Sequence, residues 1–229
     1  MIVSISQSNY IPWKGYFDLI AKSDVFVIYD EVQYTKNDWR NRNIIKTAKG
    51  TEWLTIPVNQ KGLNQRIYDT KVSFNNWGKK HRGTLQVNYA KADSFKEVRD
   101  MVFDWLSTDA ELLTDINTTI IKGICKQLGI GTRIIDSREL NLVGEPSERL
   151  VDACKKLDAS VYLSGPAGKN YLKCELFEQE EMTVEWMDYS GYKEYPQLHP
   201  PFEHGVSVLD LLFNVGKYEA INLMKYARK

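Results

Sequence analysis

The chain has 229 residues, of which 43% are hydrophobic, so it is long and apolar enough to bury a sizeable core. Thirty basic and thirty acidic side chains give a formal net charge of zero, which excludes a global field that would draw the protein to nucleic acid or to an anionic membrane. No basic-then-apolar leader precedes Ile2, and no apolar run approaches the ~20 residues that a membrane-spanning helix needs. We therefore expect residues 1–229 to form one domain in the cytoplasm, with no nucleic-acid partner and no membrane span.

The chain opens with the pattern of a strand, a polar loop, a short helix and a second strand. The apolar run 2–5 gives way to a polar loop closed by Pro12 and Gly15, and a second β-rich run ends on Asp30. This order is typical of a mononucleotide-binding α/β unit, whose ligands bind beyond the carboxyl ends of the strands. We expect residues 7–16 and 30–34 to share one rim of the sheet.

A basic loop follows this unit. Residues 36–49 hold five basic side chains against one acidic one, a local net charge of +4, with the aromatic Trp39 among them. The apolar residues 44–45 and 53–58 flank a turn at Gly50, which predicts a β-hairpin inserted into the sheet fold.

The pattern becomes helical between about residues 76 and 129, after a short strand predicted at 70–74. Trp77, His81, Leu85 and Tyr89 recur every four residues, so a helix would place them on one face. Two further helices are predicted by the capping-box spacings at 94–97 and 108–111, and Gly129 is well placed to end the second.

The last hundred residues return to alternating strands and helices. Strands are predicted at 133–136, 160–163 and 183–187, and helices at 146–156 and 217–227, with a cap at Ser207 before an apolar run. The fold class is therefore α/β: a Rossmann-like, mostly parallel sheet with an inserted β-hairpin and a helical segment. The loop that begins Ser164-Gly165 follows a predicted strand and could present backbone N–H groups to an anion.

Two titratable residues are candidates for proton transfer. Asp30 ends a strand beside basic residues, so its carboxylate could accept a proton or orient an amine; alternatively it orders the loop by accepting backbone N–H bonds. His81 could act as a general acid or base if it faces the rim, or it could pack beside Trp77 with a hydrogen bond to the backbone.

The basic loop is a candidate phosphate site, and its alternative is a solvated loop. Charges of one sign interleaved with Tyr34 and Trp39 suit a ligand that has both phosphates and a ring, such as a nucleotide-linked sugar or another phosphorylated small molecule.

Several other chemistries are disfavoured. Among His81, His199 and His204 no pair has the i, i+4 spacing of a helical metal site, so we expect no metal. The three cysteines are widely spaced, which favours buried, reduced thiols over a disulfide or zinc site. Cys154 lies on the inward face of a predicted helix, where burial would raise the pKa of its thiol. The chain has neither a Walker A spacing nor a Gly-x-Ser-x-Gly elbow.

The combination of these motifs resembles the WbqC-like protein family. The residues that carry the likeness run from Gln7 through Trp13-Lys14-Gly15-Tyr16-Phe17 and Tyr29-Asp30-Glu31-Val32-Gln33-Tyr34 to Asn41-Arg42-Asn43, with Ser164-Gly165-Pro166 and 207–214 later in the chain. The resemblance spans almost the whole chain. It implies an association with gene clusters for the synthesis of O-antigen, which is the polysaccharide of lipopolysaccharide, and of other bacterial surface polysaccharides.

A weaker likeness concerns the loop after the first strand. Nucleotidyltransferase-like proteins have a His-x-Gly-His motif there, and Trp13-Lys14-Gly15-Tyr16 occupies the equivalent place with the glycine kept and both histidines replaced. The resemblance implies that the loop geometry is retained, whereas the phosphate-stabilising imidazoles are lost. Lys14 could replace part of their charge.

These observations lead to a hypothesis with two forms. The first is a surface-polysaccharide enzyme, a sugar N-acyltransferase or amide-forming transferase, that transfers an acyl or aminoacyl group to the amine of a nucleotide-linked sugar. This enzyme would have no tightly bound cofactor. It would use an acyl-CoA or acyl-carrier thioester as donor, with a carrier protein as partner. Asp30 or His81 would take the proton of the sugar amine, and the Gly165 loop would stabilise the oxyanion. The second is a non-catalytic nucleotide-sugar-binding protein of the same machinery. A further alternative is a scaffold whose basic loop docks a partner protein. The expected ligand-binding residues in both are Gln7, Trp13, Lys14, Tyr16, Gln33, Tyr34, Arg40, Asn41, Arg42, Lys46, Ser164 and Gly165.

Overall fold

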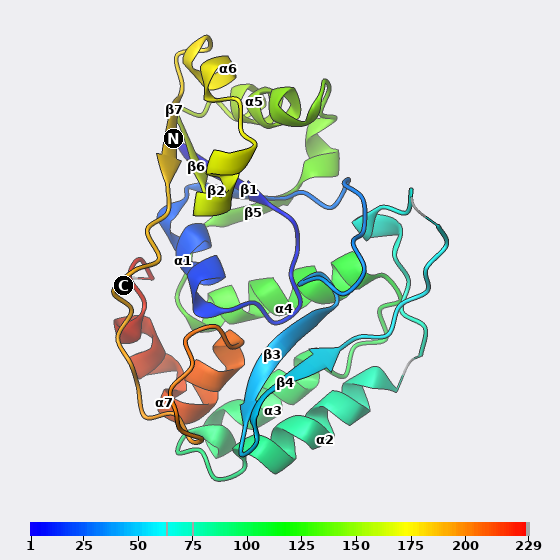
Figure 1. Ribbon diagram of the computed structural model, residues 1–229, viewed down its shortest axis with the longest axis vertical. Coiled ribbons are helices and arrows are strands. Elements are labelled where there is room, and N and C mark those ends of the chain that lie inside the picture. The colour runs from blue at the N-terminus through cyan, green and yellow to red at the C-terminus, as the bar shows by residue number, and fades with distance from the viewer. Residues whose placement is uncertain (63, 75, 228–229) are drawn as a thin grey trace.

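A computed structural model describes residues 1–62, 64–74 and 76–227 and places a five-stranded sheet at one end of the molecule (Figure 1). Neighbouring strands are parallel, and the strand order is β5-β2-β1-β6-β7. The strands are β1 (Ile2–Ser6), β2 (Val25–Ile28), β5 (Arg133–Asp136), β6 (Val161–Ser164) and β7 (Thr183–Trp186). The α/β, Rossmann-like fold class predicted from the sequence is confirmed.

The strand order creates a switch point. The chain passes from β1 to β2 and β5 on one side and later crosses to β6 and β7 on the other, so neighbouring crossovers diverge between β1 and β6. Because all five strands run the same way, their carboxyl ends lie at one edge, and a crevice opens there in folds of this kind.

Helices cover both faces of the sheet because β2 is apolar on both. Val25 and Val27 pack with α5 (Pro146–Lys156) and α6 (Cys174–Glu178), whereas Phe26 and Ile28 pack with α1 (Lys14–Lys22) and α4 (Leu113–Gln127). This alternation is what a strand buried on both faces requires.

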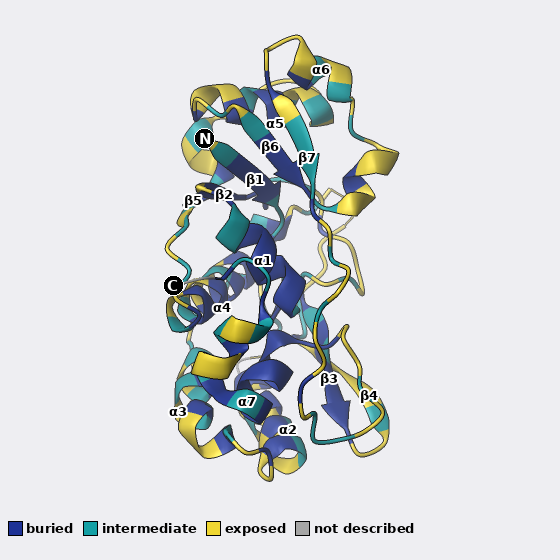
Figure 2. Ribbon diagram, turned by 90° about the vertical axis from the view of Figure 1, so that its left-hand side faces the viewer, coloured by how far each residue is buried: buried dark blue, intermediate teal, exposed yellow. Residues whose placement is uncertain are grey.

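A second layer lies beyond α1. It contains the antiparallel hairpin of β3 (Arg42–Thr47) and β4 (Gly50–Thr55), with α2 (Trp77–Tyr89), α3 (Phe95–Trp105) and α7 (Val208–Leu223). One buried cluster continues from the sheet through α1 into this layer, so α1 is buried in the middle of the molecule (Figure 2). The remaining elements are the short helices η1 (Ile67–Asp69), η2 (Ser137–Leu140) and η3 (Pro166–Asn170).

Most predicted elements are confirmed, including the hairpin turn at Gly50 and the end of α4 at Gly129, whose φ is 66°. The strand predicted at 70–74 is wrong: this segment forms only isolated bridges, Val58 with Val72 and Lys71 with Leu112. The Ser94 side chain makes no capping bond to α3, and α4 begins at Leu113, later than the spacing at 108–111 implied.

The last helix also differs from the prediction. Ser207 Oγ accepts the Leu209 N–H as expected, but the helix starts there and runs to Leu223, broken only at Gly216. Among the described residues no helix is long and apolar enough to cross a membrane.

The break at Gly216 generates a stability prediction. Its φ of 73° and ψ of 172° lie in a region that is essentially restricted to glycine, and an added Cβ would lie 3.0 Å from Ser94 Oγ. Gly216→Ala should therefore lower the unfolding free energy by about 1–3 kcal/mol. Gly131→Ala is the matched control, because no atom lies within 4 Å of its added Cβ and its φ is not positive. Equal denaturation midpoints for the two variants would contradict this reading.

Candidate functional site

The loop after β1 is held from beneath by a buried carboxylate. Asp30, 2% exposed, accepts hydrogen bonds from the Ser8 N–H (2.8 Å), Ser8 Oγ (2.6 Å) and Thr114 Oγ1 of α4 (2.6 Å). Burial raises the pKa of Asp30, and the hydrogen bonds from Ser8 and Thr114 oppose that rise. The geometry is that of the loop-ordering alternative.

The segment before β3 and the start of β3 hold the same loop from the other side. The Tyr10 N–H donates to the Trp39 carbonyl (2.9 Å), Asn43 Nδ2 donates to the Tyr10 carbonyl (2.9 Å), and the Arg40 guanidinium bonds Asn9 Oδ1. The loop therefore has a fixed path between the sheet and the hairpin.

A cavity of about 430 Å³ lies at the carboxyl ends of β1 and β6, which is the switch point of the sheet. We call it the switch crevice. Its walls are rich in tyrosine, and none of the described residues that line it is charged. They are Ile5, Ser6, Gln7, Trp13, Tyr16, Leu19, Tyr29, Val32, Pro146, Ser147, Leu150, Tyr162, Ser164, Gly165, Ala167, Gly168, Tyr171 and Tyr189.

Close packing shapes the wall of the switch crevice. The Tyr16 hydroxyl donates to the Gln7 carbonyl (3.0 Å), and the Trp13 and Tyr189 rings lie 5.0 Å apart. A Cβ on Gly15 would lie 2.3 Å from the Trp13 ring, and one on Gly168 would lie 2.5 Å from Ser164 Oγ. Both glycines are therefore needed for these contacts, which explains the glycine in the Trp13-Lys14-Gly15 motif.

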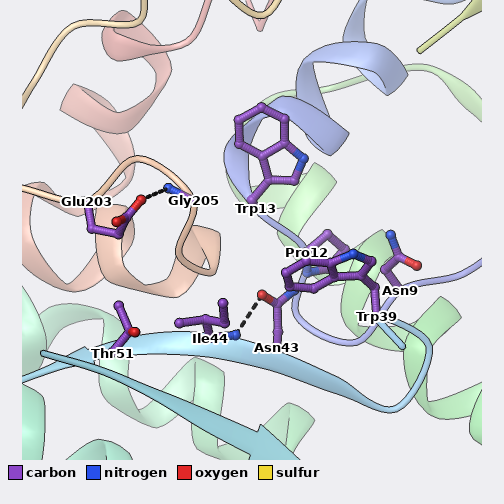
Figure 3. A pocket seen from close by; sticks show the side chains of 9 residues that line it. All are labelled: Asn9, Pro12, Trp13, Trp39, Asn43, Ile44, Thr51, Glu203 and Gly205. Carbon is purple, nitrogen blue, oxygen red and sulfur yellow. Dashed lines mark hydrogen bonds between the residues drawn. The ribbon is translucent and has the colours of Figure 1, made fainter. Parts of the chain in front are cut away.

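A second cavity, of about 500 Å³, shares Trp13 with the switch crevice. We call it the hairpin cavity. Trp13 lines both cavities, and the other residues around the hairpin cavity come from the first loop, the hairpin and the 203–205 turn (Figure 3): Asn9, Pro12, Trp39, Asn43, Ile44, Thr51, Glu203 and Gly205.

Lys14 is buried next to these cavities without lining either. Its Nζ lies 3.1 Å from His204 Nδ1 and 5.1–5.5 Å from the ring centres of Tyr192, Tyr195 and Phe202. Burial lowers the pKa of Lys14 to about 8, although the charges of two nearby aspartates oppose the shift. This ammonium group therefore fastens the loop 191–205 over α1.

A second buried carboxylate, Asp210 of α7, holds the same loop. Asp210 accepts hydrogen bonds from the hydroxyls of Tyr89 (2.8 Å) and Tyr195 (2.6 Å) and from Gln197 Nε2 (2.8 Å). Two of the loops beside the cavities, the one after β1 and the one before α7, are thus each held by a buried aspartate.

The structure brings together five of the expected ligand-binding residues in the switch crevice: Gln7, Trp13, Tyr16, Ser164 and Gly165. The other seven line neither cavity. Lys14 is enclosed by aromatic rings, Gln33 is exposed, Tyr34 is buried in the core and Asn41 Nδ2 bonds the Ile56 carbonyl. The three remaining residues, Arg40, Arg42 and Lys46, belong to the basic loop.

The basic loop does not form a cluster of cations. Arg40 faces Asn9 and Asp38, Arg42 stacks 4.0 Å from the Trp53 ring centre, and buried Lys46 donates to the Pro201 carbonyl at 2.5 Å. Arg40, Arg42 and Lys46 each have a partner within the chain, and these partners do not bring the three charges together. A shared phosphate site at these three residues therefore stays a prediction.

His81 is enclosed in the helical layer. Its Nδ1 lies 2.7 Å from the Tyr10 hydroxyl and its Nε2 lies 3.1 Å from the Thr55 carbonyl oxygen, beside the Trp77 ring. Burial lowers the pKa of His81 to about 4. Neither His81 nor Asp30 lines a cavity, and proton transfer by either would require it to leave the partners described above.

Of the residues around the hairpin cavity, the sequence pointed to Trp39 as a ligand-binding aromatic, but it did not indicate Asn9, Asn43, Thr51 or Glu203, nor Tyr171 and Tyr189 in the switch crevice. Tyr189 could have been found, because it follows the carboxyl end of a predicted strand. Across residues 1–62, 64–74 and 76–227, no group of three or more His, Cys, Asp or Glu side chains could hold a metal ion.

Comparison with known proteins gives a family match over nearly all of the chain. The model of the WbqC-like protein family matches residues 7–221. The chain is 44% identical over 229 residues to "Uncharacterized protein Rv1507c" of Mycobacterium tuberculosis (strain ATCC 25618 / H37Rv), and the alignment covers 99% of each chain. No solved structure shows a significant match.

The environment of His81 generates a pH prediction. The His81 side chain has a pKa near 6.5 in the unfolded chain and a pKa of about 4 in the folded chain. Between these two pH values the unfolded state therefore binds more protons at His81 than the folded state does. Stability present above pH 6.5 should be lost as the pH falls towards 4, by at most about 3 kcal/mol.

Denaturant unfolding at pH 7 and pH 4.5 measures this loss. His81→Gln should lose less stability than the parent between the two pH values, because the titrating group is gone. His199→Gln is the control and should keep the parental pH dependence, since it leaves His81 in place. A parental pH dependence in His81→Gln would contradict the assignment.

Proposed function

The chain belongs to the WbqC-like protein family, and from this and the geometry of the site we propose that it binds a nucleotide-linked sugar during the synthesis of bacterial surface polysaccharide. The observation that carries the proposal is the switch crevice, an uncharged, tyrosine-rich cavity at the point where α/β sheets of this topology bind their ligands.

The walls of the switch crevice suit the nucleoside part of such a ligand. Tyr29, Tyr171 and Tyr189 offer ring faces on which a base can stack, and stacking tolerates any base. Ser164 and the backbone after Gly165 lie at the carboxyl end of β6, where N–H groups can bind phosphate oxygens without a basic side chain.

Binding is better supported than catalysis. Acyl or aminoacyl transfer to a sugar amine needs a group that takes the amine proton, and both residues proposed for that role, Asp30 and His81, lie outside the cavities. The non-catalytic form of the hypothesis requires only the crevice itself. We therefore favour a protein that holds or delivers the nucleotide-linked sugar within the assembly machinery.

Calorimetric titration with a panel of UDP-, dTDP- and GDP-linked sugars tests the proposal. At least one should bind, and Tyr171→Ala should weaken its binding roughly tenfold, because a base-stacking ring is lost. Tyr171 is 68% exposed and Tyr218 is 65% exposed outside both cavities, so Tyr218→Ala is the matched control and should bind like the parent.

No binding across the panel, or equal losses in the two variants, would contradict the proposal. Mass spectrometry of the bound sugar after incubation with acyl-CoA separates binding from transfer. An intact sugar supports the binding role, and an acylated one would show that the protein is an enzyme.

A further inference from the structure

Trp39 is a large apolar side chain left in solvent at the hairpin cavity. Its residue is 40% exposed, and its indole lies 5.2 Å from that of Trp53, which is 42% exposed and stacked under Arg42. Exposed aromatic surface of this kind marks a binding site when it borders a cavity. Trp39 does border one, the hairpin cavity of about 500 Å³.

The position of Trp39 is set by the protein. Its N–H donates to Asp38 Oδ1 at 2.7 Å, and its carbonyl accepts the Tyr10 N–H at 2.9 Å. The indole is therefore presented by a fixed backbone, which reduces the ordering cost of binding. Trp13 is the second tryptophan that lines this cavity, and its indole lies apart from that of Trp39 (Figure 3).

Hydrogen-bonding groups surround these rings. The Asn9 Oδ1 is engaged by Arg40, so its Nδ2 remains the group that it can offer a ligand. The Asn43 amide is fixed by the Tyr10 carbonyl and the Ile44 N–H, and Thr51 adds a hydroxyl at the hairpin. Apolar faces ringed by such groups match a pyranose, whose C–H faces are apolar and whose edge carries hydroxyls.

The charge at the cavity is negative. Glu203 is the one charged side chain among the described residues that line it, and Glu203 Oε1 is oriented by the Gly205 N–H at 2.9 Å. A carboxylate repels phosphate and attracts an ammonium group by a charge-assisted hydrogen bond. Three cations lie on the flanking segments without lining the cavity, and each has its own partners: Arg40 with Asn9 and Asp38, Lys46 with the Pro201 carbonyl, and Lys14 with His204.

We propose that the hairpin cavity is a hexosamine site, in which a pyranose ring packs on Trp39 and Trp13 and its amine faces Glu203. The inference rests on the proposed function in one respect: the hexosamine is taken to be the sugar of the nucleotide-linked ligand. Trp13 lines both cavities, so they are neighbours, and in this proposal one molecule places its nucleoside in the switch crevice and its sugar in the hairpin cavity.

Saturation-transfer NMR with free monosaccharides tests the site directly. The full chain should bind D-glucosamine more tightly than D-glucose, and glucose 6-phosphate least, because the phosphate approaches Glu203. Trp39→Ala should weaken glucosamine and glucose alike, roughly tenfold. Glu203→Gln should weaken glucosamine roughly two- to fivefold and leave glucose unchanged, as expected for an exposed ion pair.

Two matched variants separate the site from general effects. Glu52→Gln removes an exposed carboxylate from β4 next to Thr51 without touching the cavity, and Trp53→Phe keeps an aromatic ring against Trp39. Both should bind glucosamine like the parent. The site is overturned if no monosaccharide binds, if glucose 6-phosphate binds best, or if Trp39→Ala and Glu203→Gln bind glucosamine like the parent.

The outcome is distinguishable from failure of the proposed function. If glucosamine binding follows the expected order while no nucleotide-linked sugar or UDP binds, the hexosamine site stands and the nucleotide proposal falls. If UDP binds the parent and Tyr171→Ala weakens it, while glucosamine does not bind, the nucleotide proposal stands and the hexosamine site falls.

Discussion

The hydrogen bonds accepted by the buried Asp30 carboxylate are the interaction on which the site depends. A carboxylate that is 2% exposed is tolerated only where donors replace its lost water, and Asp30 has three: two from Ser8 and one from Thr114. These donors belong to the loop after β1 and to α4, so the carboxylate just after the end of β2 joins the sheet, the loop and α4 at one point. Removing it would leave the loop that borders both cavities without its support from the sheet.

A second buried carboxylate, that of Asp210, holds the loop before α7 in the same way. Asp210 accepts hydrogen bonds from Tyr89, Tyr195 and Gln197, and the Lys14 ammonium group lies among aromatic rings of the loop that these residues fasten. Both loops are held by buried polar groups, which are costly when unpaired and directional when paired. The two cavities that share Trp13 are therefore largely preformed.

Periodicity in the sequence predicted the sheet, the hairpin and the helices, because apolar spacing reports burial directly. Ligands of open α/β sheets bind beyond the carboxyl ends of the strands, so the predicted strand positions alone placed Gln7, Tyr16, Ser164 and Gly165 at the ligand-binding edge of the sheet. The ligand site expected at the basic loop stays a prediction, because clustering of charge in sequence does not show where each side chain points: Arg42 stacks on the Trp53 ring, and Lys46 donates to the Pro201 carbonyl. The hairpin cavity could not be predicted, because Asn9 and Glu203 are far apart in the sequence and line the same cavity only in the folded chain.

In the proposed binding mode Trp13 lies between a nucleoside site and a sugar site, and a crystal structure with UDP-glucosamine tests this most directly. We expect the uracil to lie in the switch crevice among Tyr29, Tyr171 and Tyr189, and the glucosamine ring to lie on Trp39 with its amine at Glu203. Binding of the diphosphate across Arg40 and Arg42, with both cavities empty, would contradict the account and restore the basic loop as the ligand site.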